Sequence, residues 1–466
     1  MDKIFGKTKH IHFIGIGGIG MSGMAELLLN HGFIITGSDI SESERIHHLK
    51  KIGVKIYIGH RSNNINNYDL VVYSSAVNKS DNLEVLESKR LNIPIIKRAE
   101  LLGEMIKLKK ISLAVSGTHG KTTTSSMVGN ILSEGNLNPT VITGGIVNKF
   151  NSNNISGSGN IIVVEADEYD KSFLSLTPTY ASINNMELEH LDIYEDLEDL
   201  KENFIKFANS VPFYGNVSLG IDSLHVRNIL PKIKKTHKTF GVIHNADIMA
   251  KKIQFKKNKT YFDVWINQKK TFGIKLNIPG LHNVYNALSA ISICLETDAD
   301  YNSIIKGLEK FSGVKRRFEI KYENINNQNI MLIDDYAHHP SEIFSTIQAT
   351  KSGWPNRRII SIFQPHLFSR TRDFYKDFSK SLMESDINIL APIFPAREKP
   401  IKNINSSIIS KELKRIGHKK TFTCDNINGI SSIIKGRANK DDIILVMGAG
   451  DIYKSIDAIC EAITSA

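Results

Sequence analysis

The sequence SGTHGKTTT occupies residues 116–124, between the apolar run at 111–115 and a stretch of helical character. Glycines let backbone N–H groups surround phosphate oxygens, a lysine adds mobile positive charge, and a hydroxyl beside the lysine can ligate Mg²⁺. The common triphosphate loop has a glycine five residues before Gly120, where Val115 stands in this chain. The segment therefore predicts a variant loop that binds ATP or GTP, between a strand and a helix.

Apolar runs of strand length alternate with helical stretches on both sides of this loop. They lie at His12–Ile16, Ile34–Thr36, Leu70–Tyr73, Leu113–Val115, Ile161–Val164, Met331–Ile333, Ile359–Phe363, Ile387–Leu390 and Ile443–Met447. Such alternation predicts an α/β protein with parallel sheets. Polar and apolar residues alternate within Ile253–Ile278, which predicts an antiparallel hairpin appended to the central part.

Length and composition predict several domains. A chain of 466 residues exceeds what one hydrophobic core usually spans. Boundaries at Lys107–Lys110 and Phe311–Val314 divide it into residues 1–107, 108–312 and 313–466. We expect a Rossmann-like N-terminal domain, a central P-loop ATPase-like domain with a small antiparallel β addition, and a Rossmann-like C-terminal domain.

The bulk composition favours a globular protein of the cytoplasm. Apolar residues make up 41% and charged residues 23%, and the sequence contains neither a long apolar run nor a secretory signal, so we expect no membrane partner. The three cysteines are far apart, which fits reduced thiols. The net charge of +11 is spread thinly, without a basic block, so we expect no nucleic-acid partner. An excess of positive charge would also favour the binding of anionic nucleotide substrates.

The first glycine loop along the chain, GIGGIG, occupies residues 15–20 and follows the first apolar run. It fits the spacing G-x-G-x-x-G, and Asp39 stands where dinucleotide-binding folds keep an acid for the ribose. Alone, the loop would point to an NAD enzyme. However, such a loop binds the pyrophosphate group and not the nicotinamide. Because the chain also has a separate triphosphate loop, a diphospho-sugar nucleotide is the better candidate ligand for GIGGIG.

Carboxylates follow the apolar run Ile161–Val164, at Glu165, Asp167 and Glu168. Ligands of open α/β sheets bind at the carboxyl ends of the strands, so these acids should lie near the triphosphate loop. Because Mg²⁺ prefers oxygen ligands, Glu165 is the favoured candidate ligand. His190 follows the next strand and could approach the same edge, although a lone loop histidine is usually only a polar residue.

Together these motifs resemble the ATP-dependent Mur ligases of peptidoglycan synthesis. The resemblance covers nearly the whole chain in order. It is carried by Gly15–Ser22, Gly37–Asp39, Ser74–Val77, Gly117–Thr124, Glu165–Asp170, His190–Tyr194, Gly280–Ala287, Gly313–Glu319, Asp334–Pro340, Gln364–His366, Ser369–Thr371 and Gly448–Gly450.

The resemblance implies that the chain joins L-alanine to the lactyl carboxylate of UDP-N-acetylmuramate through an acyl phosphate, with ATP and two Mg²⁺ ions, as a monomer or homodimer. The implied catalytic residues are Lys121, Glu165, His190, Arg317, His338 and Arg370. The implied ATP-binding residues are Gly117, Thr118, His119, Gly120, Lys121, Thr122, Thr123, His282, Asn283, Asn286 and Arg317. The implied metal ligands are Thr122, Glu165 and His190. The implied contacts to the UDP substrate are Gly15, Gly17, Gly18, Gly20, Ser38, Asp39, Ser74, Ser75 and Ala76.

Three other functions compete with this interpretation. A recycling ligase of the same superfamily would attach a preformed peptide instead of alanine, but Gln364–His366 and Ser369–Thr371 resemble the alanine-adding branch more closely. An NAD-dependent oxidoreductase is suggested by the first glycine loop alone. A nonenzymatic interaction protein would bind ATP and release no phosphate when offered substrates.

Overall fold

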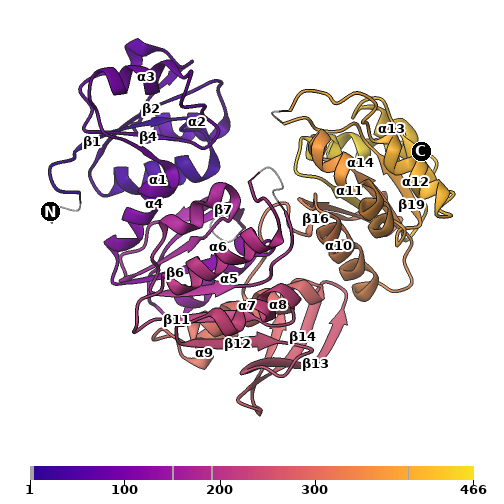
Figure 1. Cartoon of the computed structure of the whole chain (residues 1–466). Coiled ribbons are helices and arrows are strands. Elements are labelled where there is room, and N and C mark those ends of the chain that lie inside the picture. The colour runs from indigo at the N-terminus through magenta and orange to yellow at the C-terminus, as the bar shows by residue number, and fades with distance from the viewer. Residues whose placement is uncertain (1–4, 149–151, 190–192, 397, 466) are drawn as a thin grey trace. The chain divides into compact units, whose positions relative to one another are not determined.

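The computed structural model describes residues 5–148, 152–189, 193–396 and 398–465, and every element below belongs to these ranges. Three β-sheets of five, ten and six strands follow one another along the chain, with helices between the strands (Figure 1). This arrangement confirms the predicted three-domain α/β fold. No helix in the described ranges is both long and apolar enough to cross a membrane.

The N-terminal sheet has five parallel strands in the order β3-β2-β1-β4-β5. Its strands are β1 (His10–Ile14), β2 (Ile34–Asp39), β3 (Lys55–Ile58), β4 (Leu70–Tyr73) and β5 (Ile95–Lys97). Its helices are α1 (Ile19–Asn30), α2 (Glu44–Lys51), α3 (Leu83–Arg90) and α4 (Arg98–Met105). The strand order reverses at β1, which lies between β2 and β4. The first glycine loop therefore leaves the sheet at the point where ligands of such folds bind.

The central sheet has the order β15-β14-β13-β12-β11-β10-β6-β9-β7-β8. Its first seven strands in sequence are β6 (Ile111–Ser116), β7 (Thr140–Val147), β8 (Ser152–Ile155), β9 (Ile161–Glu165), β10 (Tyr180–Ile183), β11 (Asn216–Gly220) and β12 (His237–Gly241). Its helices are α5 (Lys121–Glu134), α6 (Leu197–Asn209), α7 (Leu224–Ile229), α8 (Leu281–Cys294) and α9 (Tyr301–Glu309). β6 lies between β10 and β9 and is parallel to both, so the segments that follow these three strands meet at one edge.

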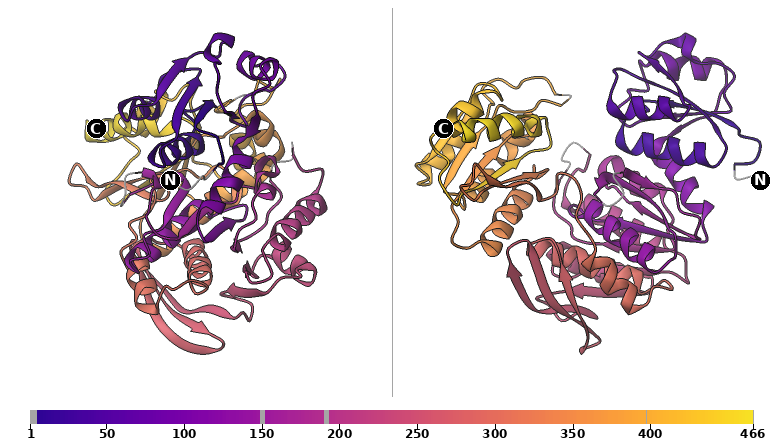
Figure 2. Two further views of the ribbon diagram at one scale, coloured as in Figure 1. Left: turned by 90° about the vertical axis from the view of Figure 1, so that its left-hand side faces the viewer. Right: turned by 180° about the vertical axis from the view of Figure 1, so that it is seen from behind.

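The β addition predicted for the central domain is present, but it has three strands instead of the two of a hairpin. It comprises β13 (Ile248–Lys256), β14 (Lys259–Ile266) and β15 (Lys269–Leu276), joined by two-residue connections. β12 pairs in parallel with β13, so the three strands continue the central sheet, as the view from behind shows (Figure 2). The alternating pattern identified the strands correctly, but their attachment to β12 depends on pairing between distant residues.

The C-terminal sheet has the order β16-β17-β21-β18-β19-β20 and is parallel except for β16. Its strands are β16 (Glu319–Ile325), β17 (Ile330–Asp335), β18 (Ile359–Phe363), β19 (Ile387–Leu390), β20 (Thr421–Thr423) and β21 (Ile443–Met447). Its helices are α10 (Pro340–Gly353), α11 (Phe368–Leu382), α12 (Ser407–Arg415), α13 (Gly429–Ile434) and α14 (Ile456–Thr464). β16 was not predicted from the sequence, because most of its residues are polar and at least partly exposed.

The chain forms two compact units. The first comprises residues 1–252, 262–274 and 285–311, and the second comprises residues 253–261, 275–284 and 312–466. In the first unit one continuous apolar core joins the N-terminal and central sheets, with Leu101 and Met105 of α4 in the same cluster as Phe173. The second unit buries apolar residues in two clusters around its own sheet.

Candidate active site

The triphosphate-type loop connects β6 to α5, as its sequence predicted. Gly120 precedes the helix with φ of 83°, in the left-handed region that favours glycine, and a Cβ there would collide with the Asn286 side chain. Gly117 has φ of 127°. The loop thus presents backbone N–H groups at the N-terminus of a 14-residue helix, an arrangement that favours anions.

Lys121 is the first residue of α5, and its ammonium group donates hydrogen bonds to three oxygens. Its Nζ donates to the Gly117 carbonyl at 2.8 Å, the Thr118 carbonyl at 3.2 Å and Glu168 Oε2 at 2.7 Å. The lysine side chain is 15% exposed and that of Glu168 is 2% exposed. Burial alone would lower the pKa of Lys121, but the nearby carboxylates of Glu168 and Asp167 outweigh burial and hold this pKa above its usual value. Lys121 is therefore a fully charged cation.

Glu168 is a buried acid that the sequence analysis noted but did not nominate. Burial raises its pKa to about 7, against the attraction of Lys121. The Tyr194 hydroxyl donates to the Glu168 backbone carbonyl at 2.6 Å. Only the folded chain brings this carboxylate to Lys121, so the sequence alone offered no signal that separates it from its acidic neighbours.

Thr122 and Glu165 lie side by side at the start of α5. The Thr122 hydroxyl donates to Glu165 Oε2 at 3.1 Å, and the Gly144 N–H donates to Glu165 Oε1 at 2.5 Å. Burial raises the pKa of Glu165. The hydroxyl and the carboxylate are hard oxygen donors of the kind that Mg²⁺ prefers. The third predicted ligand, His190, lies outside the described residues.

The segment that follows β10 supports the loop. Asn185 accepts the His119 N–H at 2.8 Å and donates to the His119 carbonyl at 3.1 Å. The Glu187 N–H donates to the Thr118 hydroxyl at 2.9 Å, and Glu187 Oε2 lies 3.3 Å from His119 Nε2. Thr118 and His119 therefore fix the loop in place. No sequence motif identified Asn185 and Glu187 as the partners of Thr118 and His119.

A buried polar network continues from the loop into α8. Asn184 donates to the Thr124 hydroxyl at 2.9 Å, and that hydroxyl donates to Asn286 Oδ1 at 3.3 Å. The Ser289 hydroxyl donates to Asn184 Oδ1 at 2.6 Å. Asn286, predicted to bind ATP, thus lies against the first turns of α5. Thr123 is buried in the same turn.

In the N-terminal domain the first glycine loop contacts the acid predicted for it. The Gly17 N–H donates to Asp39 Oδ2 at 2.8 Å, and Arg45 Nη1 donates to the Gly17 carbonyl at 3.0 Å. Ser74 lies against Gly15, since a Cβ on Gly15 would be 3.1 Å from the serine Cβ. The Ala76 N–H donates to the Ser74 hydroxyl at 3.3 Å.

Ser38 is fully buried, unlike its neighbours in the predicted substrate site. Its hydroxyl donates to Glu84 Oε2 at 2.5 Å, and Asn64 Nδ2 donates to Glu84 Oε1 at 2.5 Å. His60 Nδ1 lies 3.2 Å from Glu84 Oε2. Burial tends to raise the pKa of Glu84, but hydrogen bonds from these groups and from His12 hold it well below its usual value. This network is a buried support for β2.

In the second unit, Glu342 gathers two of the predicted catalytic residues at the start of α10. Its Oε2 accepts the His338 N–H at 3.0 Å and lies 3.1 Å from His338 Nδ1. Arg317 Nη1 lies 3.5 Å from Glu342 Oε1, and the guanidinium lies 5.0 Å from the Tyr336 ring centre. Sequence reasoning missed Glu342, which the capping-box position of α10 could have indicated.

The other predicted site residues of the second unit are His282, Asn283 and Arg370. Burial, together with the positive charge of Arg317, lowers the pKa of His282 to about 4. Asn283 donates to the Pro279 carbonyl at 2.7 Å and so fixes the start of α8. Arg370 lies in the first turn of α11, and His366, just before this helix, packs edge-on against His338 with ring centres 5.9 Å apart.

These features define a three-domain α/β protein with a triphosphate-type loop and a separate glycine loop of the diphosphate type. Three family models match successive parts of the chain. Residues 10–110 match the model of the Mur ligase family, catalytic domain, residues 115–294 match the Mur ligase middle domain, and residues 316–450 match the Mur ligase, glutamate ligase domain. The chain belongs to the Mur ligase family.

Individual relatives agree with this assignment. The chain is 46% identical over 457 residues to UDP-N-acetylmuramate–L-alanine ligase of Persephonella marina, covering 98% of this chain and 97% of the relative. The crystal structure of UDP-N-acetylmuramate-alanine ligase from Thermotoga maritima matches with a TM-score of 0.82 and 31% identity, over 98% of this chain and 99% of that one. A UDP-N-acetylmuramate:L-alanyl-γ-D-glutamyl-meso-diaminopimelate ligase from Neisseria meningitides matches with a TM-score of 0.60 and 28% identity, over 66% of this chain and 100% of that one.

Proposed function

We propose that the chain joins L-alanine to the lactyl carboxylate of UDP-N-acetylmuramate at the expense of ATP, giving UDP-N-acetylmuramoyl-L-alanine, ADP and phosphate. The observation that carries the proposal is the charged Lys121 in a glycine loop at a helix N-terminus, beside Thr122 and Glu165. Relatives named as alanine ligases match nearly the full length of the chain, at up to 46% identity.

The first chemical step transfers a phosphoryl group. A carboxylate oxygen of the substrate forms a bond to the γ-phosphorus of ATP, and the bond from that phosphorus to the bridging oxygen of ADP breaks. The product is an acyl phosphate. This step needs alignment and neutralisation of negative charge more than covalent help from the protein. The loop N–H groups and Lys121 supply both, and Arg317 would add a second cation.

Mg²⁺ fits the oxygen donors at this site. Thr122 would hold one ion, and Glu165 with His190 would hold a second. When bound, the metal would neutralise charge on the phosphate oxygens. The Thr122 hydroxyl, which donates to Glu165 in this structure, would turn its oxygen lone pair toward the ion.

In the second step the amine of L-alanine attacks the carbonyl carbon of the acyl phosphate. A tetrahedral intermediate forms, the C–O bond to phosphate breaks, and the proton that the nitrogen loses is taken up by the departing phosphate as the amide forms. His338 and Arg370 are the proposed contacts for the muramoyl group or the amino acid. Water must be excluded at this stage, because it would hydrolyse the acyl phosphate. Both ATP and the nucleotide sugar are metabolites of the cytoplasm, so we expect the protein to act there.

The test is phosphate release from ATP with UDP-N-acetylmuramate, comparing L-alanine, glycine, L-serine and a muramyl tripeptide as acceptors, with mass spectrometry of the product. We expect turnover with L-alanine and the mass of UDP-N-acetylmuramoyl-L-alanine. Preference for the tripeptide would refute the proposal in favour of a recycling ligase. Reduction of NAD without phosphate release would indicate an oxidoreductase, and ATP binding without turnover would indicate a nonenzymatic protein.

A further inference from the structure

The strands β7 and β8 form a two-stranded ribbon at one edge of the central sheet. β7 pairs in parallel with β9 only as far as Ile142 and Val164, which is one residue before Glu165. β8 pairs antiparallel with β7, and the register between these two strands shifts after Ile142. The second half of β7 therefore leaves its pairing with β9 beside the candidate metal ligand.

At this point the ribbon contacts the carboxylate of Glu165. The Gly144 N–H donates to Glu165 Oε1 at 2.5 Å, while the other oxygen, Oε2, accepts the Thr122 hydroxyl at 3.1 Å. A Cβ on Gly144 would lie 3.1 Å from Glu165 Oε2, closer than most side chains approach a neighbour. Hydrogen bonds to a ligating carboxylate orient it toward its metal ion. The Gly144 N–H therefore orients Glu165, and a methyl group at this position would move the carboxylate.

The other end of the ribbon is anchored on the helix that carries the first glycine loop. Asn153 Nδ2 donates to the Ile19 carbonyl at 2.9 Å, and Asn154 Nδ2 donates to the Gly23 carbonyl at 3.0 Å. Ile19 belongs to the GIGGIG loop, and Gly23 lies on α1. A Cβ on Gly23 would be 3.3 Å from Asn153 Nδ2, so the backbone of α1 approaches β8 closely.

Thr143 connects the two ends within the ribbon. Its buried hydroxyl lies 2.8 Å from the Gly145 carbonyl and 3.2 Å from the Asn153 carbonyl. The irregular part of β7 is thus held against β8 immediately before Gly144. A short series of contacts therefore runs from the glycine loop through the ribbon to the carboxylate of Glu165.

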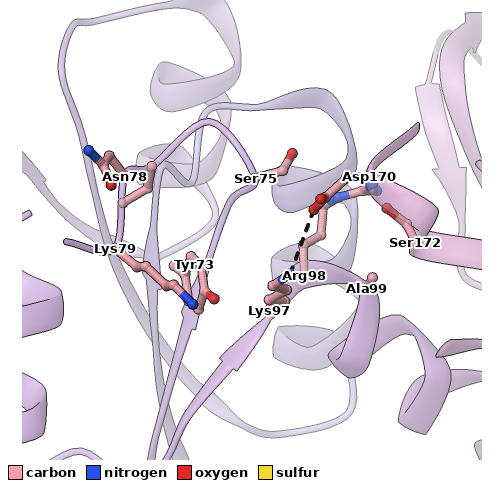
Figure 3. Close-up of a pocket in the computed structure, with 10 residues that line it drawn as sticks. Tyr73, Ser75, Asn78, Lys79, Lys97, Arg98, Ala99, Asp170 and Ser172 are labelled. Carbon is pink, nitrogen blue, oxygen red and sulfur yellow. Dashed lines mark ion pairs between the residues drawn. The ribbon is translucent and has the colours of Figure 1, made fainter. Parts of the chain in front are cut away.

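The two elements that the ribbon joins also border a pocket of about 200 Å³ in the first unit (Figure 3). Arg98 lines it from the N-terminal domain and Asp170 from the segment after β9. A Cβ on Gly20, which follows Ile19, would be 3.0 Å from Arg98 Nη1. An element fastened to both Ile19 and Glu165 therefore fixes the glycine loop and the candidate metal ligand relative to each other.

We infer that Gly144 and Asn153 are positioning residues for Glu165. Gly144 orients the carboxylate through its N–H, and Asn153 holds the ribbon, and with it Gly144, on the first glycine loop. The inference rests on the proposed function for the role of Glu165 as a metal ligand. Neither residue belongs to the motifs that identified the two glycine loops.

Titration of the full chain with Mn²⁺, followed by electron paramagnetic resonance of the free ion, tests the inference without turnover. Mn²⁺ takes the same kinds of oxygen ligand as Mg²⁺. The variant Glu165→Gln defines the binding that depends on this carboxylate. Gly144→Ala should weaken that binding by roughly tenfold to a hundredfold. Gly273→Ala is the matched control, because it is a strand glycine whose added Cβ would meet no atom closer than 3.8 Å.

A second measurement separates positioning from general damage to β7. β7 packs against α5, since a Cβ on Gly129 would be 2.9 Å from Val141. General disruption of β7 would therefore disturb the triphosphate loop and weaken the binding of ADP without metal. Calorimetry should show unchanged metal-free ADP affinity in Gly144→Ala. Equal losses of ADP and Mn²⁺ affinity would overturn the positioning role.

Asn153→Ala tests the anchor. It should weaken Mn²⁺ binding by about twofold to tenfold, the effect of one hydrogen bond. Because both residues act on Glu165 through the same ribbon, the double variant with Gly144→Ala should lose less affinity than the product of the two separate losses. Asn67→Ala, at an exposed position before β4, is the control. Unchanged affinity in Asn153→Ala, or losses that multiply, would overturn the anchoring role.

These outcomes are distinct from those of the proposed function. If Gly144→Ala binds Mn²⁺ as the unaltered chain does, the inference is overturned, even when the unaltered chain ligates alanine. If Mn²⁺ affinity depends on Gly144 and Glu165 but no amide forms, the proposed function fails and the positioning role stands. Equal Mn²⁺ binding by the unaltered chain and Glu165→Gln overturns the inference together with the proposed metal ligand.

Discussion

Lys121 has two sets of partners in the proposed reaction. In this structure its ammonium group is held by Glu168 and two loop carbonyls. Phosphate oxygens would replace part of this set when ATP binds, so the lysine is kept charged and close to its place of action. Glu168, the acid that holds the lysine, also makes the site dependent on pH, because burial raises its pKa.

Lys121→Ala should lower kcat for phosphate release by about a thousandfold or more, because it removes a cation that neutralises the transferred phosphoryl group. Steady-state kinetics with L-alanine as acceptor measures the effect, and circular dichroism checks the fold. Lys89→Ala is the control, since Lys89 is exposed on α3. Turnover within tenfold of the unaltered chain would refute the role of Lys121.

Glu168→Gln should change how stability depends on pH. The pKa of Glu168 is about 7 in the folded chain, against an ordinary value of 4.5. The folded chain therefore binds the proton more tightly, and the free energy of unfolding falls as pH rises from about 4.5 to 7, by on the order of 3 kcal/mol. The glutamine variant lacks this loss, so its stability relative to the unaltered chain should increase across this range.

Urea unfolding at several pH values between 5 and 8 measures this difference. Glu104→Gln serves as the control, because Glu104 is 55% exposed on α4. If the curves of the unaltered chain and the Glu168→Gln variant run parallel from pH 5 to 8, Glu168 does not titrate in this range and the assignment is wrong.

At the scale of elements, the junction between β6 and α5 depends on a helix far away in sequence. Asn286 of α8 lies where a side chain on Gly120 would have to go, and it accepts a hydrogen bond from Thr124. The conformation of the loop is therefore set jointly by its own glycines and by the packing of α8 against α5.

Gly120→Ala should lower the free energy of unfolding by about 1–3 kcal/mol and raise KM for ATP, because alanine is strained at this φ and its methyl group displaces Asn286. Gly135→Ala, at the other end of α5 with φ of −79°, should change stability by less than about 1 kcal/mol. Thermal denaturation and ATP titrations compare the two. Equal effects would show that the left-handed conformation is not the cause.

At the scale of the whole molecule, the proposed chemistry draws on both units. Lys121 and Glu165 belong to the first unit, whereas Arg317, His338 and Arg370 belong to the second. Because the proposed reaction needs both sets at one place, we predict that substrate binding changes the arrangement of the units.

We expect the radius of gyration to decrease when a nonhydrolysable ATP analogue and UDP-N-acetylmuramate bind together, because the substrates must reach groups from both units. Small-angle X-ray scattering with neither, one and both ligands measures the change. Indistinguishable scattering curves in all conditions would contradict a ligand-dependent rearrangement.

The sequence predicted those features that local chemistry fixes. The two glycine loops, the acids after β9 and the alternation of strands and helices depend on residues close together in the chain, so their motifs can be read directly. The hairpin shows the limit of such patterns. Alternation within Ile253–Ile278 identified strands, but their continuation of the central sheet depends on the pairing of β12 with β13.

The sequence by itself determined the fold class, the order of the three domains and the positions of the phosphate-type loops. Only the tertiary structure decided which side chains act together. Glu168 lies 47 residues from Lys121, Glu84 lies 46 residues from Ser38, and Arg98 reaches Gly20 across the N-terminal domain. The physical reason is that strand order and helix packing bring distant carboxylates and cations together, and no local pattern encodes which of several similar residues becomes the partner.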